Sequence, residues 1–230
     1  MIKYGIFIFG VLVLGVVFLR PSSSIPEPEE ITLTIPEGYT ARQMGELFEK
    51  SELFLKDEFL AIAQKEEGYL FPDTYRFFKK TTPEKVIEKM KKNFEEKTRD
   101  LSISHEIIIM ASIIEKEVRG QEDRKIISGI LWRRIKEGIG LQVDASLNYI
   151  LGKTSAKLTA DDLKVDSQYN TYKYRGLPVG PIGNPGLNAI LAALNPSKSP
   201  YLFYLSDKDG VTRFAKNFEE HKANKLRYLR

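Results

Sequence analysis

Residues 105–119 restrict the fold of this chain more than any other segment. They follow Ser104, a residue type that often caps helix N-termini, and they precede Gly120, a common helix stop. After His105 and Glu106, two turns with the sequence Ile-Ile-Ile-Met-Ala-Ser-Ile-Ile carry apolar side chains almost all round the predicted helix. A helix without a polar face has to be covered on every side, so we expect this one at the centre of a folded domain.

Two carboxylates, Glu115 and Glu117, lie near the end of this apolar helix. Successive residues rotate by about 100° around a helix, so these two side chains should point to nearly opposite sides. A carboxylate among aliphatic groups has a raised pKa, which a general acid at neutral pH requires. The helix pattern alone leaves open which one faces a cleft, or whether Glu115 only pairs with Lys116 or Arg119.

The N-terminus carries sixteen residues without a charge, positions 4–19, directly after Lys3. A membrane span needs roughly 20 apolar residues, so we predict a single transmembrane anchor over residues 1–20. The run ends Val-Phe-Leu-Arg-Pro and lacks the small residues of a cleavage site, which favours an anchor over a cleaved signal peptide. Lys3 places the N-terminus inside and the rest of the chain outside. Residues 21–30, rich in Pro, Ser and Glu, are predicted to be an extended tether.

The composition excludes several classes of function. There is no cysteine, which rules out disulfides, thiolate metal sites and a cysteine nucleophile. The only histidines, His105 and His221, lie far apart and outside any metal-binding pattern, so we expect neither a metal nor a cofactor. The net charge of +4, from 35 basic and 31 acidic residues, gives no reason to expect nucleic acid as a partner.

The remaining patterns predict an α+β fold. The chain from residue 31 should form a small α/β module over 31–66, then a mixed helical and β-hairpin domain over 67–230. Periodicity and turn residues predict a strand at 31–35, helices at 41–50 and 53–64, an aromatic loop at 67–76, helices at 82–97 and 122–137, a helix from Ala145 capped by Asp144, a turn-rich loop at 167–186, a helix at 187–194, a hairpin of 201–205 with 211–214, and a helix from Glu219.

Four motifs occur in order along the folded part. They are Glu67-Gly-Tyr-Leu-Phe-Pro-Asp-Thr-Tyr75, Ala111-Ser-Ile-Ile-Glu-Lys-Glu117, Leu141-Gln-Val-Asp144 and Tyr169-Asn-Thr-Tyr172 with Gly176-Leu-Pro-Val-Gly-Pro-Ile-Gly-Asn-Pro-Gly186. Together they resemble the endolytic murein transglycosylases, the MltG or YceG-like family. The resemblance runs from about Ile31 to the C-terminus.

The resemblance implies that residues 31–66 are LysM-like and that residues 67–230 cleave the MurNAc–GlcNAc β-1,4 bond of nascent peptidoglycan, leaving 1,6-anhydro ends and limiting strand length. It also implies that the first Glu of the Glu-Lys-Glu motif, Glu115, is the catalytic acid/base. Further motif positions are then expected to line the glycan groove: Gln142, Asp144, Tyr169, Asn170, Thr171 and Asn184.

A lytic transglycosylase needs one carboxylate, because the 6-hydroxyl of the sugar attacks the anomeric carbon within the same molecule. Two alternatives stay open. One is a non-catalytic peptidoglycan-binding or cell-division scaffold, and the other is a hydrolase that uses Glu115 with Asp144 or Glu117. The expected location is the cytoplasmic (inner) membrane, single-pass, with the catalytic domain on the outer or periplasmic side. The expected partners are glycan strands and, by the resemblance alone, peptidoglycan synthases.

Overall fold

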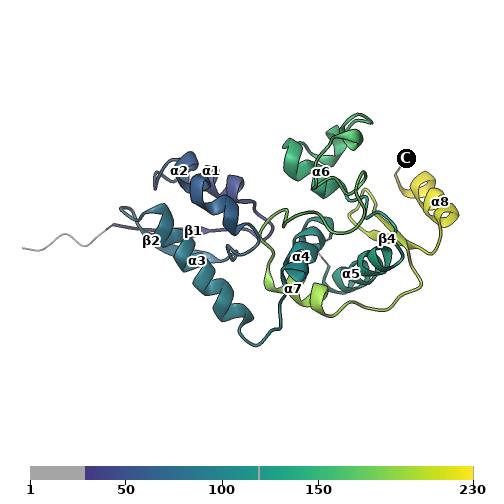
Figure 1. The fold of residues 1–230 in the computed structure, drawn as a ribbon, viewed down its shortest axis with the longest axis horizontal. Coiled ribbons are helices and arrows are strands. Elements are labelled where there is room, and N and C mark those ends of the chain that lie inside the picture. Colours follow the sequence, from purple (N-terminus) through teal and green to yellow (C-terminus); the bar gives the residue numbers. More distant parts are fainter. Residues whose placement is uncertain (1–28, 119, 230) are drawn as a thin grey trace, which may run out of the picture.

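The computed structural model describes residues 29–118 and 120–229, and these form an α+β protein with helices around two small sheets (Figure 1). In chain order the elements are β1 (Glu30–Thr34), α1 (Ala41–Lys50), α2 (Lys56–Ala63), η1 (Gln64–Glu66), β2 (Thr74–Phe78), α3 (Pro83–Thr98), α4 (His105–Glu117), α5 (Gln121–Lys136), α6 (Asp144–Leu151), η2 (Ser155–Lys157), η3 (Asp162–Lys164), α7 (Leu187–Leu194), β3 (Phe203–Ser206), β4 (Thr212–Ala215) and α8 (Phe218–Tyr228).

The first hydrophobic cluster gathers β1, β2 and the helices α1–α3. Its strands pair antiparallel, with Glu30 opposite Phe78 and Thr34 opposite Thr74. The predicted helix at 41–50 is confirmed, with Thr40 accepting a hydrogen bond from Gln43 N as its cap. The aromatic loop predicted over 67–76 is wrong at its end, because Thr74–Phe78 forms β2. Buried and exposed side chains alternate along β2, as expected for a strand with one face on the core.

The module expected over 31–66 completes its sheet with later residues. β2 follows residue 66, and Val86 and Met90 of α3 are fully buried in the same cluster as Met44 and Phe48 of α1. The first packing unit therefore extends to about residue 90, although the domain limits and the LysM-like character of residues 31–66 stay predictions.

The second cluster surrounds α4, which lies between α7, α5 and α6 (Figure 1). Residues 108–114 of α4 are all buried, which confirms that this helix is central. Its predicted cap is also confirmed, since Ser104 Oγ accepts a hydrogen bond from Ile107 N. The helix ends at Glu117, two residues before the predicted end, because Val118 takes an extended backbone conformation.

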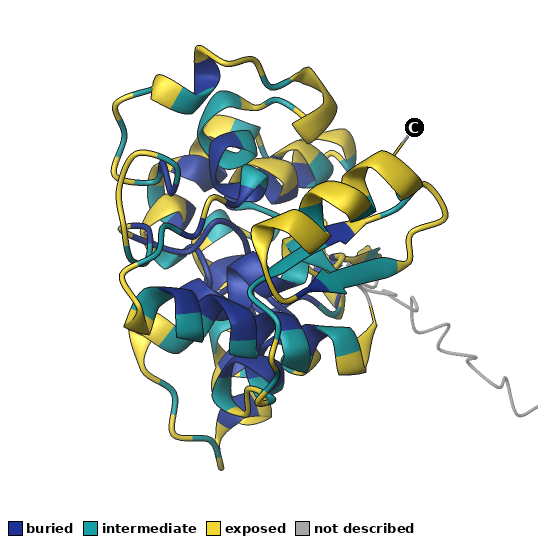
Figure 2. Cartoon of the chain, turned by 90° about the vertical axis from the view of Figure 1, so that its right-hand side faces the viewer, coloured by how far each residue is buried: buried dark blue, intermediate teal, exposed yellow. Residues whose placement is uncertain are grey.

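The C-terminal part is the predicted hairpin and helix. β3 and β4 pair antiparallel, with Phe203 opposite Ala215, and α8 packs against both strands. Figure 2 shows that α8 presents a largely exposed outer face. No helix within residues 29–118 or 120–229 is long and apolar enough to cross a membrane. The predicted anchor at 1–20 and most of the tether at 21–30 lie outside the described residues, and Glu30 already belongs to β1.

Candidate active site

A cleft of about 1330 Å³ is lined by residues from α1, α4, α6, β3 and α8. One wall comes from α1 of the first cluster, through residues such as Arg42 and Gln43. The end of α4 and the start of α6 lie in its middle, and β3 and α8 form the far wall. Both hydrophobic clusters therefore contribute to one cleft, whose volume exceeds the roughly 300–1,000 Å³ of small-molecule sites.

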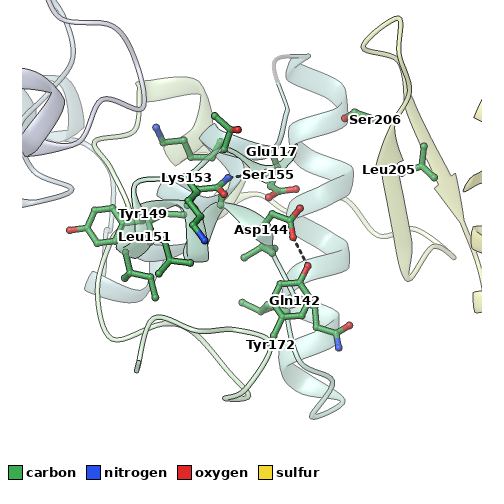
Figure 3. A pocket seen from close by; sticks show the side chains of 18 of the residues that line it. Glu117, Gln142, Asp144, Tyr149, Leu151, Lys153, Ser155, Tyr172, Leu205 and Ser206 are labelled. Atoms are coloured by element: carbon green, nitrogen blue, oxygen red, sulfur yellow. Dashed lines mark hydrogen bonds between the residues drawn. The ribbon is translucent and has the colours of Figure 1, made fainter. Parts of the chain in front are cut away.

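Glu117 lines this cleft as the last residue of α4 (Figure 3). Its Oε2 accepts a hydrogen bond of 3.0 Å from the hydroxyl of Tyr204 on β3. Burial raises the pKa of Glu117 to about 7, the nearby charge of Asp144 adds to the rise, and the Tyr204 hydrogen bond opposes it. A carboxylic acid with this pKa can both donate and accept a proton near neutral pH.

Asp144 faces the same cleft from the start of α6 (Figure 3). Its predicted role as the cap of this helix is wrong, because Val143 occupies the cap position and no side chain caps the helix. Asp144 Oδ1 instead accepts a hydrogen bond of 2.5 Å from the Tyr172 hydroxyl. A partner 28 residues further along the chain therefore fixes the carboxylate toward the cleft.

Gln142 is the second predicted binding residue that lines the cleft. Its backbone has φ 53°, which places this residue in the left-handed region. Arg134 of α5 donates one hydrogen bond to Gln142 Oε1 at 3.1 Å and another to Gly140 O at 3.0 Å. The arginine therefore holds the segment that leads from α5 to Asp144.

Glu115 lies on the other side of α4, as the helical rotation predicted, and it does not belong to the residues that line the cleft. Its Oε1 is 2.6 Å from Arg124 Nη2, and its Oε2 accepts a hydrogen bond of 3.0 Å from Gly186 N. Burial raises the pKa of Glu115, while Gly186 and Arg124 oppose that rise. Its side chain is 5% exposed, and both of its carboxylate oxygens are held by Arg124 and Gly186 N. Glu115 therefore lies outside the lining of the cleft, on the face of α4 opposite Glu117, and its catalytic role stays a prediction.

Asn170 and Thr171 are buried and hold loops together. Asn170 Nδ2 donates to the carbonyls of Leu163 and Val165. Thr171 Oγ1 accepts a hydrogen bond from Val143 N. Neither residue lines the cleft, and Thr171 holds Val143, the residue before Asp144. Their contact with glycan stays a prediction.

Asn184 is fully buried where the two clusters meet. Its Oδ1 accepts hydrogen bonds from Gly68 N and Leu70 N, and its Nδ2 donates to Tyr39 O and, at 2.6 Å, to Glu67 Oε1. This asparagine joins three segments that are far apart in sequence and has no surface on the cleft.

Tyr169 is partly buried and does not line the cleft either. Its ring packs against that of Tyr149, with centroids 5.1 Å apart. Tyr149 does line the cleft, and its hydroxyl donates to Glu67 Oε2 at 3.3 Å. Tyr169 therefore supports a residue of the cleft wall.

The structure thus brings Gln142 and Asp144 together with Glu117, and places the other predicted site residues behind the cleft wall. Sequence reasoning missed the partners Arg134, Tyr172 and Tyr204. Tyr172 had a signal, since it belongs to the fourth motif, whereas Tyr204 looked like any aromatic residue of a strand. Among residues 29–118 and 120–229, no group of three or more His, Cys, Asp or Glu side chains could hold a metal ion.

Comparisons with known proteins agree on one family. A family model described as the YceG-like family matches residues 19–227. An endolytic murein transglycosylase of Bacillus subtilis is 38% identical over 173 residues, which cover 71% of this chain and 48% of that protein. One of Streptococcus pneumoniae is 32% identical over 246 aligned residues, covering 86% of this chain and 44% of that protein.

The crystal structure of a YceG-like protein from Listeria monocytogenes has the same fold. It superposes with a TM-score of 0.73 at 37% identity, covering 84% of this chain and 75% of that one. The chain spans about half the length of the two transglycosylases that it matches.

Proposed function

Because the chain belongs to the YceG-like family, we propose that it is a lytic transglycosylase that cleaves peptidoglycan glycan strands. Relatives at 32–38% identity carry the name endolytic murein transglycosylase, which supports this substrate class. The observation that carries the proposal is a carboxyl group with a pKa of about 7 that lines a large cleft. A cleft with walls from both hydrophobic clusters has room for several sugar units of a strand.

In this proposal the catalytic acid/base is Glu117 and not Glu115, the residue that the family resemblance implied. Glu117 lines the cleft, and its raised pKa keeps a large fraction protonated at neutral pH. Glu115 is committed to Arg124 and to the Gly186 N–H. The catalytic position of the Glu-Lys-Glu motif is therefore its second glutamate.

In the proposed reaction, protonated Glu117 gives its proton to the glycosidic oxygen between MurNAc and GlcNAc as the C1–O bond breaks. The resulting carboxylate accepts the proton of the MurNAc 6-hydroxyl, whose oxygen then bonds to C1. The products are a 1,6-anhydro-MurNAc end and a free GlcNAc 4-hydroxyl, and Glu117 is protonated again. Because the attack is intramolecular, no water has to be positioned.

Neighbouring side chains of the cleft have complementary roles. Tyr204 keeps the Glu117 carboxyl in one orientation through its hydrogen bond. Asp144, fixed by Tyr172, places a negative charge where positive charge develops on the sugar ring during bond breakage. Gln142 offers its amide to the sugar from the segment beside Asp144.

A second candidate is a hydrolase, and one observation favours it. Asp144 faces the same cleft as Glu117, so it could act as the base that activates water. In that reaction the product carries a reducing end, and Asp144→Asn would lower the rate as strongly as Glu117→Gln. In the transglycosylase reaction Asp144 takes no proton, so its replacement costs less than that of Glu117.

Location and partners extend the proposal. The uncharged run at residues 4–19 supports a single anchor in the cytoplasmic membrane, with the cleft on the outer or periplasmic side. There the enzyme would meet nascent strands close to their synthases and limit strand length. Alkaline carbonate extraction of cell membranes tests the anchor, since an integral membrane protein stays in the pellet and a peripheral one is released.

The reaction is tested with the full 230-residue chain in mild detergent, given uncrosslinked peptidoglycan and followed by mass spectrometry of the fragments. Wild type should release fragments with anhydro ends. Glu117→Gln, which keeps the shape but loses the proton, should lower the rate at least ~100-fold and still bind glycan in a pull-down. Reducing ends would establish the hydrolase, whereas glycan binding without cleavage by wild type would favour the scaffold protein.

A further inference from the structure

One buried ion pair lies behind the cleft, on the side of α4 opposite Glu117. Glu115 Oε1 and Arg124 Nη2 are 2.6 Å apart, with side chains only 5% and 7% exposed. The proposed reaction uses neither group. Buried ion pairs contribute little net stability compared with well-packed apolar residues, so their directional bonds are the more informative property.

Arg124 forms a second bond that reaches the main chain beside Glu117. Its Nε donates to the Val118 carbonyl at 3.1 Å. Val118 is the residue at which α4 ends, immediately after Glu117, and its backbone is extended. The arginine therefore ties the point where the chain leaves the helix to α5, the helix that carries Arg124.

Glu115 extends the same network to α7. Its second oxygen accepts the hydrogen bond from Gly186 N, and Gly186 is the residue that precedes α7. The carboxylate also lies where the positive end of the α7 dipole favours a negative charge. Two side chains thus join the last turn of α4 to α5 and to α7, the helices packed beside it (Figure 1).

We propose that Glu115 and Arg124 are positioning residues, which hold the end of α4 so that the Glu117 carboxylate stays aimed into the cleft. The inference rests on the proposed function with Glu117 as proton donor. A displacement of about 1 Å at a reacting group can lower a rate by roughly 100-fold, so a small relaxation of this helix end has a measurable effect.

The first test is Arg124→Lys, which keeps a cation beside Glu115. A single ammonium group cannot reproduce the fixed fork of a guanidinium, so the bond to the Val118 carbonyl is lost. We expect kcat to fall roughly 10-fold or more with KM within about twofold of wild type, because the binding surface is unchanged. Thermal unfolding followed by circular dichroism shows whether the variant is folded.

The pH profile supplies a readout that a merely structural role would not move. The charged and titratable groups around Glu117 are Tyr204 on β3, Asp144 on α6, Tyr172 in the loop before α7, Arg134 on α5 and its own neighbour Lys116. Loosening the end of α4 lets water reach Glu117, which lowers its pKa. The fall of kcat at high pH should therefore begin at a lower pH in Arg124→Lys than in wild type.

The second test separates positioning from catalysis at Glu115 itself. Glu115→Gln keeps an oxygen that can accept from Gly186 or Arg124, so it should retain more activity than Glu115→Ala. A proton donor would behave differently, because glutamine and alanine would both abolish turnover. Glu122→Gln is the matched control, since Glu122 is an exposed residue of α5 that forms an ion pair with Lys125 on the surface, and it should behave as wild type.

The outcomes are distinct. A folded Arg124→Lys protein with wild-type kcat and pH profile would overturn the inference and leave the proposed function intact. Glu115→Gln as inactive as Glu117→Gln would overturn it in favour of Glu115 as the acid. A wild-type chain that binds glycan and cleaves none would overturn the proposed function, and this inference with it.

Discussion

At the residue scale, two glutamates separated by one lysine have different chemical environments. Glu115 has a guanidinium and a backbone N–H as partners, whereas Glu117 has a tyrosine hydroxyl and a neighbouring carboxylate. Burial raises the pKa of both carboxyl groups, and a neighbouring carboxylate, Glu37 for one and Asp144 for the other, adds to the rise. Gly186 N and the Arg124 guanidinium oppose it at Glu115, whereas the Tyr204 hydroxyl opposes it at Glu117. The same residue type therefore suits anchoring at one position and proton donation two residues later.

The pH dependence of turnover follows from Glu117. Its pKa of about 7 means that the protonated form, which donates the proton, predominates below pH 7 and disappears above it. We expect kcat of the wild-type chain to fall about tenfold per pH unit above roughly pH 7. Initial rates of anhydro-end formation between pH 5 and 9 measure this, and a rate that stays constant to pH 9 would contradict the assignment.

At the element scale, local patterns predicted most helices but not their exact ends or partners. The helix predicted over 105–119 ends at Glu117, because Val118 gives its carbonyl to Arg124 of the next helix. Asp144 looked like a cap, yet its partner is Tyr172, which no local pattern could supply. Rotation showed that Glu115 and Glu117 diverge, but α6 and the hairpin decide which side is the cleft, and they come later in the chain.

Gly129, within α5, should be a position where the usual helix preference is reversed. Alanine favours a helix by about 1 kcal/mol over glycine. A Cβ at Gly129 would lie 2.0 Å from the Ser197 carbonyl oxygen, so the backbone around Ser197 would have to move away from α5. We expect Gly129→Ala to destabilise the protein by about 1–3 kcal/mol in thermal or urea unfolding.

Lys136→Ala, an exposed change at the end of the same helix, serves as the control and should leave stability almost unchanged. A Gly129→Ala protein more stable than wild type would mean that the segment at Ser197 moves aside without cost.

Glu67 links the turn before α1 to the loop around Asn184 and should make stability depend on pH. It is 8% exposed, and burial raises its pKa from 4.5 to about 7. The folded protein therefore keeps a proton there that the unfolded chain releases near pH 4.5. The resulting stabilisation, on the order of 3 kcal/mol, is complete below about pH 4.5 and is lost as the pH rises through 7.

Glu67→Gln cannot ionise, so its unfolding free energy should fall less than that of wild type between pH 5 and 8. Glu117 adds a change of the same sign in both proteins and cancels in the comparison. Urea unfolding at the two pH values measures the difference, and equal pH dependence would show that Glu67 titrates normally.

At the scale of the whole molecule, both hydrophobic clusters contribute walls to one cleft, and the reaction proposed there needs only proton transfer. No set of three or more His, Cys, Asp or Glu side chains suited to a metal occurs among residues 29–118 and 120–229. We therefore expect glycan cleavage by the full chain to be unchanged in excess EDTA, in the mass-spectrometric assay. Loss of activity that added Mg²⁺ or Zn²⁺ restores would contradict this.

The position of Asn184 also bears on how the protein is made. Its side chain completes hydrogen bonds of Tyr39, Glu67, Gly68 and Leu70, across separations of up to 145 residues. The first third of the chain cannot satisfy these buried groups until residue 184 has left the ribosome. Contacts so distant in sequence also form slowly. During synthesis the N-terminal segment therefore stays incompletely folded, and accessible to proteases, until the last quarter of the chain has been made.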